Sequence, residues 1–196
     1  MEQKYYADSI PSEKFYLLDK LIGKKVTKMT RYSWWEKEQS AKECGISNEN
    51  VFSLTVGPLG IEFDRNITIG VSSDIKRSSV ILWVEKFENY KADDLMEEDS
   101  ELFAVQANDK VFSNAFFASI LESTLVKYKI IKVETTNPLN WDHPREVGLV
   151  LSFSNNHQMI LSHQLTKEVS DDFTILEWEN IDKDIYESLY KTSKFW

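Results

Sequence analysis

Two runs of alternating apolar and polar residues, one in each half of the chain, limit the fold to one built on antiparallel strands. In the first half, residues 61–63 and 67–71 flank a turn-prone Asp-Arg-Asn at 64–66, and the alternating run 79–87 follows directly. In the second half, the runs VGLVLSF and QMILSH flank an Asn-Asn turn before FTILEW. Alternation with a period of two, interrupted by Asn or Asp turns, is typical of hairpins. The sequence therefore predicts a meander of antiparallel strands in each half.

Apolar residues at helical spacing precede each meander. They occur over residues 12–22, with Ser12 as the expected cap and an end near Gly23, and again over residues 113–123. The expected fold class is therefore α+β: an antiparallel β-meander sheet or sheets with a few helices. The other predicted elements are strands at 26–35, 52–56 and 125–134, a polar helical turn closed by Gly45, and a closing helix at 182–190 capped by Asp182.

The length of 196 residues suits one sizeable core, so we expect a single α+β domain over residues 1–196. Residues 59–73 align with residues 149–163, since both segments have the same order of apolar and turn residues. The alignment predicts a pseudo-repeat with two similar halves, at about 12–90 and 113–180. The alternative is that any two antiparallel meanders share such alternation, and both interpretations stay open.

The charge of the chain argues against several partners. A net charge of −9 and a pI of about 4.9 create a negative potential that repels nucleic-acid phosphates and anionic membrane surfaces. Cys44 is the single cysteine, so no internal disulfide or CxxC pair can form. The N-terminal residues form no apolar segment behind a basic start, and no 18-residue apolar run occurs. We therefore expect a cytoplasmic protein that binds neither nucleic acid nor membrane.

No catalytic, metal-binding or cofactor motif stands out in the sequence. The histidines are His143, His157 and His163, and they form neither HExxH nor HxH. Cys44 has no nucleophile signature around it, and GxSxG and phosphate-binding glycine loops are absent. The sequence therefore predicts no catalytic residue, no metal site and no cofactor, and it leaves the question of enzymatic activity open.

The tryptophans are the more informative side chains. Trp34 and Trp35 are neighbours on a predicted strand, so they should point to opposite faces, and Trp141 lies in a predicted loop. Trp83 and Trp178 are expected in the core. Tryptophan is enriched in the binding hot spots of protein interfaces, although burial in the core is an equally ordinary role for it.

Acidic residues gather in two segments, 93–101 and 171–172. Such pairs of carboxylates can bind a hard cation or act as acid and base, but adjacent charges in a loop commonly stay hydrated. They can also steer a basic protein toward exposed aromatic anchors. The candidate partner-binding residues are Trp34, Trp35, Glu36, Asp93, Asp94, Glu97, Glu98, Trp141, Asp171 and Asp172.

In general character, as a compact acidic domain without a chemistry motif, the chain resembles bacterial toxin-immunity proteins. The resemblance covers this character and no aligned motif. It implies a protein-binding module that neutralises a bacterial toxin by covering its active site, with a basic toxin domain as the partner. Two alternatives remain. One is a small-molecule-binding or enzymatic α+β domain that uses His157 or His163. The other is a structural homo-oligomer that pairs exposed strand edges.

Overall fold

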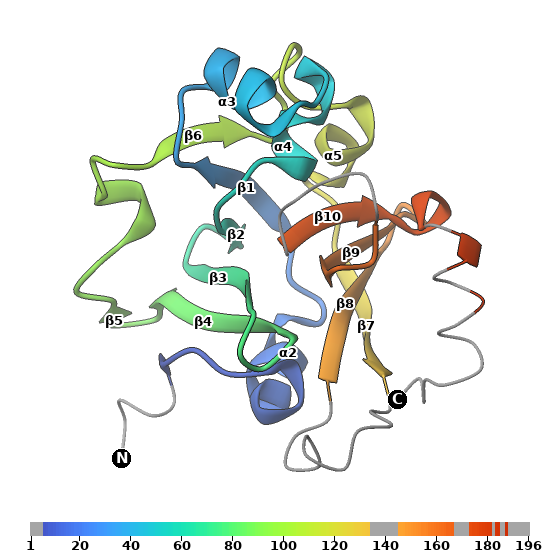
Figure 1. Cartoon of the computed structure of the whole chain (residues 1–196). Coiled ribbons are helices and arrows are strands. Elements are labelled where there is room, and N and C mark those ends of the chain that lie inside the picture. Colours follow the sequence, from blue (N-terminus) through green and yellow to red (C-terminus); the bar gives the residue numbers. More distant parts are fainter. Residues whose placement is uncertain (1–5, 134–144, 167–172, 182, 185–186, 188–196) are drawn as a thin grey trace.

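The computed structural model describes residues 6–133, 145–166, 173–181, 183–184 and 187. Their ten strands form two antiparallel sheets, one with the order β5-β4-β3-β2-β1-β6 and one with the order β10-β9-β8-β7 (Figure 1). This arrangement confirms the predicted α+β class. The strands are β1 (Val26–Ser33), β2 (Leu59–Phe63), β3 (Ile67–Asp74), β4 (Ser79–Phe87), β5 (Tyr90–Lys91), β6 (Phe103–Gln106), β7 (Leu125–Val133), β8 (Arg145–Phe153), β9 (Gln158–His163) and β10 (Phe173–Glu177).

Short helices cover the ends of the two sheets. In Figure 1, α2 lies at the opposite end of the molecule from α3, α4 and α5, which gather above β6 and β1. The helices are α2 (Phe15–Leu21), α3 (Lys37–Cys44), α4 (Val51–Leu54) and α5 (Ala115–Ile120), and 3-10 turns occupy Pro11–Lys14, Asn48–Asn50, Met96–Glu98 and Trp178–Asn180.

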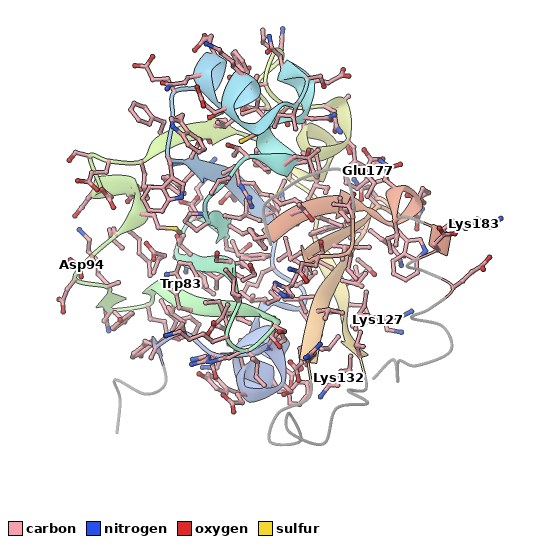
Figure 2. All side chains as sticks on the ribbon, in the orientation of Figure 1. Trp83, Asp94, Lys127, Lys132, Glu177 and Lys183 are labelled. Atoms are coloured by element: carbon pink, nitrogen blue, oxygen red, sulfur yellow. The ribbon has the colours of Figure 1, made fainter. Side chains whose placement is uncertain are left out.

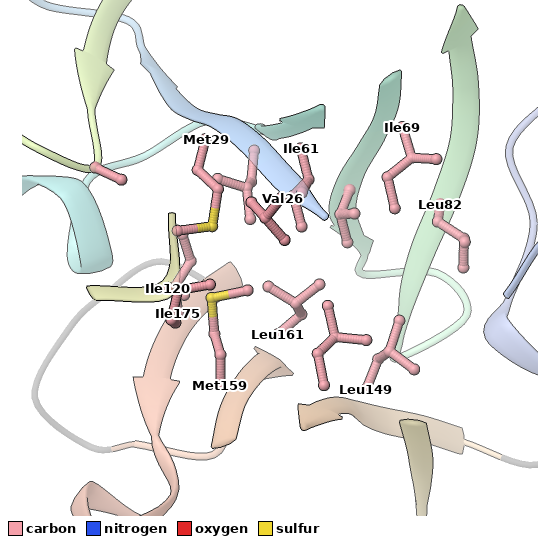
Figure 3. Packing of buried hydrophobic residues seen from close by; sticks show 14 of the residues in the cluster. Val26, Met29, Ile61, Ile69, Leu82, Ile120, Leu149, Met159, Leu161 and Ile175 are labelled. Carbon is pink, nitrogen blue, oxygen red and sulfur yellow. The ribbon is translucent and has the colours of Figure 1, made fainter. Parts of the chain in front are cut away.

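One apolar core lies between the sheets. Figure 3 shows side chains of the six-stranded sheet, such as Ile61 and Ile69, facing Leu149 and Leu161 of the four-stranded sheet. All four are fully buried. Burying an aliphatic side chain of this size stabilises a fold by about 1.5–3 kcal/mol. The alternating residues of the meanders are therefore the main source of stability, because each strand turns every second side chain into this layer.

The two halves of the chain show the same backbone pairing where they meet. The N–H of Gly23 donates to the Leu125 carbonyl at 2.8 Å, and the N–H of Glu122 donates to the Val26 carbonyl at 2.8 Å. A bulge follows the first residue of both β1 and β7, and each strand then pairs with the next strand of its own meander. Both halves thus run helix, long bulged strand and meander. That this likeness arose by duplication stays a prediction.

The strand predicted at residues 52–56 is wrong. Residues 51–54 form the helical turn α4, in which all four side chains are buried. A strand in a half-exposed sheet would bury every second residue, so the alternation read at 52–56 reflected composition and not strand geometry. The strand predicted at 26–35 ends at Ser33. Asp182 and most of the predicted closing helix lie outside the described residues.

The predicted caps had mixed outcomes. Gly45 closes α3 in the left-handed conformation with φ 67°, as predicted. Ser12 does not cap the first helix; its backbone N–H instead donates to the buried carboxylate of Glu146 at 2.8 Å. The helix predicted at 113–123 is shorter, because Asn114 caps it by accepting hydrogen bonds from the next turn.

We expect the substitution Leu161→Ala to lower the free energy of unfolding by about 2–5 kcal/mol, because it leaves a cavity between the sheets. The matched control is Val126→Ala on the same sheet, whose side chain is 50% exposed and which should cost less than about 0.5 kcal/mol. Urea denaturation of both variants measures the difference. Equal losses would contradict the placement of the core.

Candidate functional site

A groove of about 400 Å³ runs along the outer face of β1 and β6, on the side away from the core. Lys28, Thr30 and Tyr32 alternate along β1 and so share this face. In the register of the two strands, Tyr32 lies opposite Ala104 and Thr30 lies opposite Gln106. The segment 96–102 forms the other wall, with Met96, Glu97, Glu98 and Leu102. We call this feature the β1–β6 groove.

The buried carboxylate of Glu85 holds this wall against the sheet. Glu85 is 3% exposed and accepts a hydrogen bond from the indole N–H of Trp83, while its other oxygen accepts from the backbone N–H of Met96 at 3.0 Å. Trp83 in turn lies over Gly70, where an added Cβ would be 2.1 Å from the indole ring. The absence of a side chain at Gly70 therefore leaves the space that the indole occupies when its N–H donates to Glu85.

Ion pairs attach the acidic segment to lysines of the sheet. Glu97 pairs with Lys86, and with Lys28 at 3.9 Å, and Glu98 pairs with Lys91 at 2.8 Å. The hydrogen bond from Lys86 is the main cause that lowers the pKa of Glu97 below its usual value, and the charges of Lys86 and Lys28 act in the same direction. Glu97 therefore keeps its negative charge at the mouth of the groove.

A second recess of about 440 Å³ adjoins the groove, because Met96, Glu98 and Leu102 line both. The remaining lining residues of this recess include Asp93, Asp94 and Asp99. Asp93 and Asp94 are exposed. Figure 2 shows Asp94 projecting outward on the same side of the molecule as Trp83. The surface around the groove thus carries more carboxylates than the neighbouring lysines neutralise.

Trp34 follows β1 directly and is 50% exposed. Phe103, which pairs with Ser33 in the sheet, is 38% exposed. Because Ser33 precedes Trp34, the register brings the two aromatic residues to the same end of the β1–β6 pair. Glu36 is also exposed and immediately precedes α3. Trp34, Phe103 and Glu36 are therefore exposed at the end of the β1–β6 pair.

Only some of the predicted binding residues lie together in the structure. Asp93, Asp94, Glu97 and Glu98 lie along the two recesses, and Trp34 and Glu36 lie at the end of β1. Trp35 is half-buried, and the two tryptophans lie in a bend after the strand, so the alternation expected for strand neighbours does not apply to them. Trp141, Asp171 and Asp172 lie outside the described residues.

Two predictions for core tryptophans need correction, because neither side chain is fully buried. Trp83 is half-buried on the outer face, and Trp178 is half-buried against a smaller apolar cluster. Tyr32, Gln106 and Phe103 are site residues that sequence reasoning missed. The alternation of Lys28, Thr30 and Tyr32 was a usable signal for the β1 face, whereas the pairing with β6 depends on a contact between strands distant in the sequence.

The two histidines of the alternative enzymatic interpretation lie in different surroundings. Ser119 Oγ lies 2.7 Å from His157 Nδ1, but the hydroxyl donates to the Phe116 carbonyl at 2.6 Å. The Phe116 carbonyl thus competes with His157 for the single hydroxyl proton, and the side-chain amide of Asn155 also lies 3.4 Å from Nδ1, so the direction of the Ser119–His157 hydrogen bond depends on the tautomer of the ring. His163 is buried, and His143 lies outside the described residues. Among the described residues, no group of three His, Cys, Asp or Glu side chains is placed to hold a metal ion.

Tyr32 gives the groove a titration that can be measured. Burial raises the pKa of Tyr32 to about 12, and the charges of Glu97 and Glu85 act in the same direction. The raised pKa means that the contribution of Tyr32 to stability is complete below pH 10 and is lost as the pH rises toward 12.

We expect the substitution Tyr32→Phe to remove one late-titrating phenol from an ultraviolet titration of the folded protein. The control is Tyr128→Phe, which should remove another, because burial and a hydrogen bond to Asp19 also raise the pKa of Tyr128 to about 12. A Tyr32 phenol that titrates near pH 10 would show that its hydroxyl is hydrated and not buried in the β1–β6 groove.

Within the described part of the chain, no helix has the length and apolar character needed to cross a membrane. Comparison with protein-family models, with curated proteins and with solved structures found no match for this chain. The β1–β6 groove and the aromatic residues at its end are therefore the features from which a function is inferred.

Proposed function

We propose that this protein acts by binding a basic protein through the β1–β6 groove and the exposed residues Trp34 and Phe103. On this proposal it is the immunity partner of a bacterial toxin and covers the toxin's active site. The single observation that carries the proposal is the exposed indole of Trp34 at the end of a groove rimmed by carboxylates.

Trp34 supplies the anchor of the proposed interface. Trp34 is 50% exposed, and Phe103 at the same end of the β1–β6 pair is 38% exposed, so both present apolar area that a partner can remove from water. Interfaces concentrate their binding energy in a few such aromatic residues, which are surrounded by a polar rim. The carboxylates of Glu36 and of the segment 93–99 provide this rim.

The charge of the rim selects the class of partner. Asp93 and Asp94 are exposed beside the groove, and the chain as a whole has a net charge of −9. Complementary charge mainly speeds the encounter of two proteins and disfavours wrong partners. A toxin domain whose active site binds an anionic substrate has the basic surface that this rim would attract.

The first test is affinity capture of the tagged protein from cells that make it, followed by mass spectrometry and measurement of the binding constant with the purified partner. Co-expression then shows whether the protein protects cells from that partner. A partner that is acidic, or a basic partner whose toxicity is unchanged by co-expression, would overturn the proposal.

We expect Trp34→Ala to weaken binding of the captured partner by at least about 30-fold, which corresponds to a hot-spot loss of about 2 kcal/mol. The matched control is Phe15→Ala on α2, which also removes an exposed aromatic side chain, 43% exposed, at the opposite end of the molecule from β6 (Figure 1). Isothermal titration calorimetry measures both. Equal affinities of the Trp34 variant and the parent protein would place the interface elsewhere.

We expect the double substitution Asp93→Asn and Asp94→Asn to slow association about 3–10-fold at low salt, because it reduces the negative potential that steers the partner. The dissociation rate should change little. Surface plasmon resonance over a series of salt concentrations separates the two rates. An association rate that depends on salt as steeply as in the parent protein would show that the acidic segment takes no part in steering.

A further inference from the structure

The strand β7 forms a free edge of the four-stranded sheet. Its nine residues pair with β8 on one side. On the other side the N–H of Leu125 donates to the Lys24 carbonyl at 2.9 Å, and no main-chain hydrogen bond of residues 127–133 to another described segment reaches that side. Because a strand turns N–H and C=O groups alternately to its two sides, residues 127–133 keep a row of donors and acceptors ready for another strand.

This edge is basic, although the chain as a whole has a net charge of −9. The strand contains Lys127, Lys129 and Lys132 and no acidic residue. Lys132 pairs with the buried carboxylate of Glu146 at 2.9 Å, whereas no ion pair of Lys127 or Lys129 occurs within the described residues. Figure 2 shows Lys127 and Lys132 on the opposite side of the molecule from Asp94. The edge therefore carries positive charge that the protein leaves largely uncompensated.

The two unpaired lysines share one face of the sheet. Ile130 belongs to the core between the sheets, and Ile131 belongs to the smaller apolar cluster on the outer face of the four-stranded sheet. Since side chains alternate along a strand, Lys127 and Lys129 lie on the outer face with Ile131, and Tyr128 lies on the inner face with Ile130. An added strand would thus meet positive charge on one face and a different surface on the other.

That other surface is apolar. Tyr128 is half-buried and packs against the core, and Val126 at the start of β7 is 50% exposed. Ile22, at the end of α2, is 44% exposed and directly precedes Gly23, whose N–H donates to the Leu125 carbonyl. Exposed apolar side chains therefore border the inner face of the edge. A strand that alternates acidic and apolar side chains would match both faces at once.

The charge also decides against a second copy of this chain as the occupant. Two β7 strands side by side would bring the lysines of both copies along one edge, and like charges opposite each other destabilise a pair of strands. Lysine on an edge strand is a common protection against such pairing. The same lysines attract carboxylates, so the edge disfavours its own copies and favours a strand of opposite charge.

We propose that β7 binds an extended acidic segment of another protein, which adds a fifth strand to the four-stranded sheet. In this complex the main chain of the segment pairs with residues 127–133. Its carboxylates lie beside Lys127 and Lys129, and its apolar side chains lie on the face of Tyr128. Strand addition of this kind takes its affinity from main-chain hydrogen bonds and its specificity from alternate side chains.

The test is a titration of the full-length, isotope-labelled protein at low salt, followed by two-dimensional NMR. The probe is a peptide as long as β7 in which Glu and Val alternate and both ends are blocked. A peptide of the same composition with all its Glu residues before its Val residues is the matched control for charge. We expect saturable shifts of the amide signals of residues 127–133 with the alternating peptide, and at least about tenfold weaker binding of the block peptide, because it cannot match both faces.

We expect the double substitution Lys127→Gln and Lys129→Gln to weaken binding of the alternating peptide at least about tenfold, because it removes the charges that meet the carboxylates. The matched control is the double substitution Lys42→Gln and Lys110→Gln. It changes the net charge equally at two exposed lysines outside β7, and it should leave the affinity within about twofold.

Four outcomes would overturn the proposal: equal binding of the two peptides, an unchanged affinity in the Lys127 and Lys129 variant, shifts confined to residues outside β7, or no saturable shifts. Tighter binding of a thymidine oligonucleotide of equal charge would overturn it too, since it would show that the lysines recognise phosphates. Failure here leaves the proposed interface with a basic protein untouched, because the β1–β6 groove belongs to the other sheet and carries the opposite charge.

Discussion

The contact between the inner faces of the two sheets is the interaction on which the rest of this structure depends. Ile61 and Ile69 on one sheet and Leu149 and Leu161 on the other are fully buried in it. Neither meander can bury its apolar face alone, so each half stabilises the other. The pairing of backbone groups around Gly23 and Glu122 then fixes how the halves meet.

The second structural constraint acts on the outer face of the six-stranded sheet. The carboxylate of Glu85 is buried and hydrogen-bonded on both oxygens, to the Trp83 indole and to the Met96 backbone. A buried carboxylate without these partners would be costly, so the segment that follows β5 is held where it can satisfy the group. The wall of the β1–β6 groove is therefore a consequence of how this sheet satisfies the hydrogen bonds of one buried carboxyl group.

Acidic groups occur in two different surroundings in this structure. Around the groove the carboxylates are exposed or paired with surface lysines such as Lys91. Exposed carboxylates can steer a macromolecule toward this surface while they keep most of their hydration. At the end of β10 the carboxylate of Glu177 is half-buried and accepts a hydrogen bond from Asn114 at 3.2 Å.

The sequence by itself determined the strand alternation, the turns, the α+β class, the left-handed cap at Gly45 and the acidic segment beside the groove, because each depends on neighbouring residues. The prediction from sequence was wrong at residues 51–54, where tertiary contacts bury a whole helical turn. It was also wrong for Trp83, which lies on the outer face, where Gly70 leaves room for it. Only the tertiary structure decided that β6 pairs with β1 and that Glu177 meets Asn114. These contacts join residues more than sixty positions apart, and no local pattern records them.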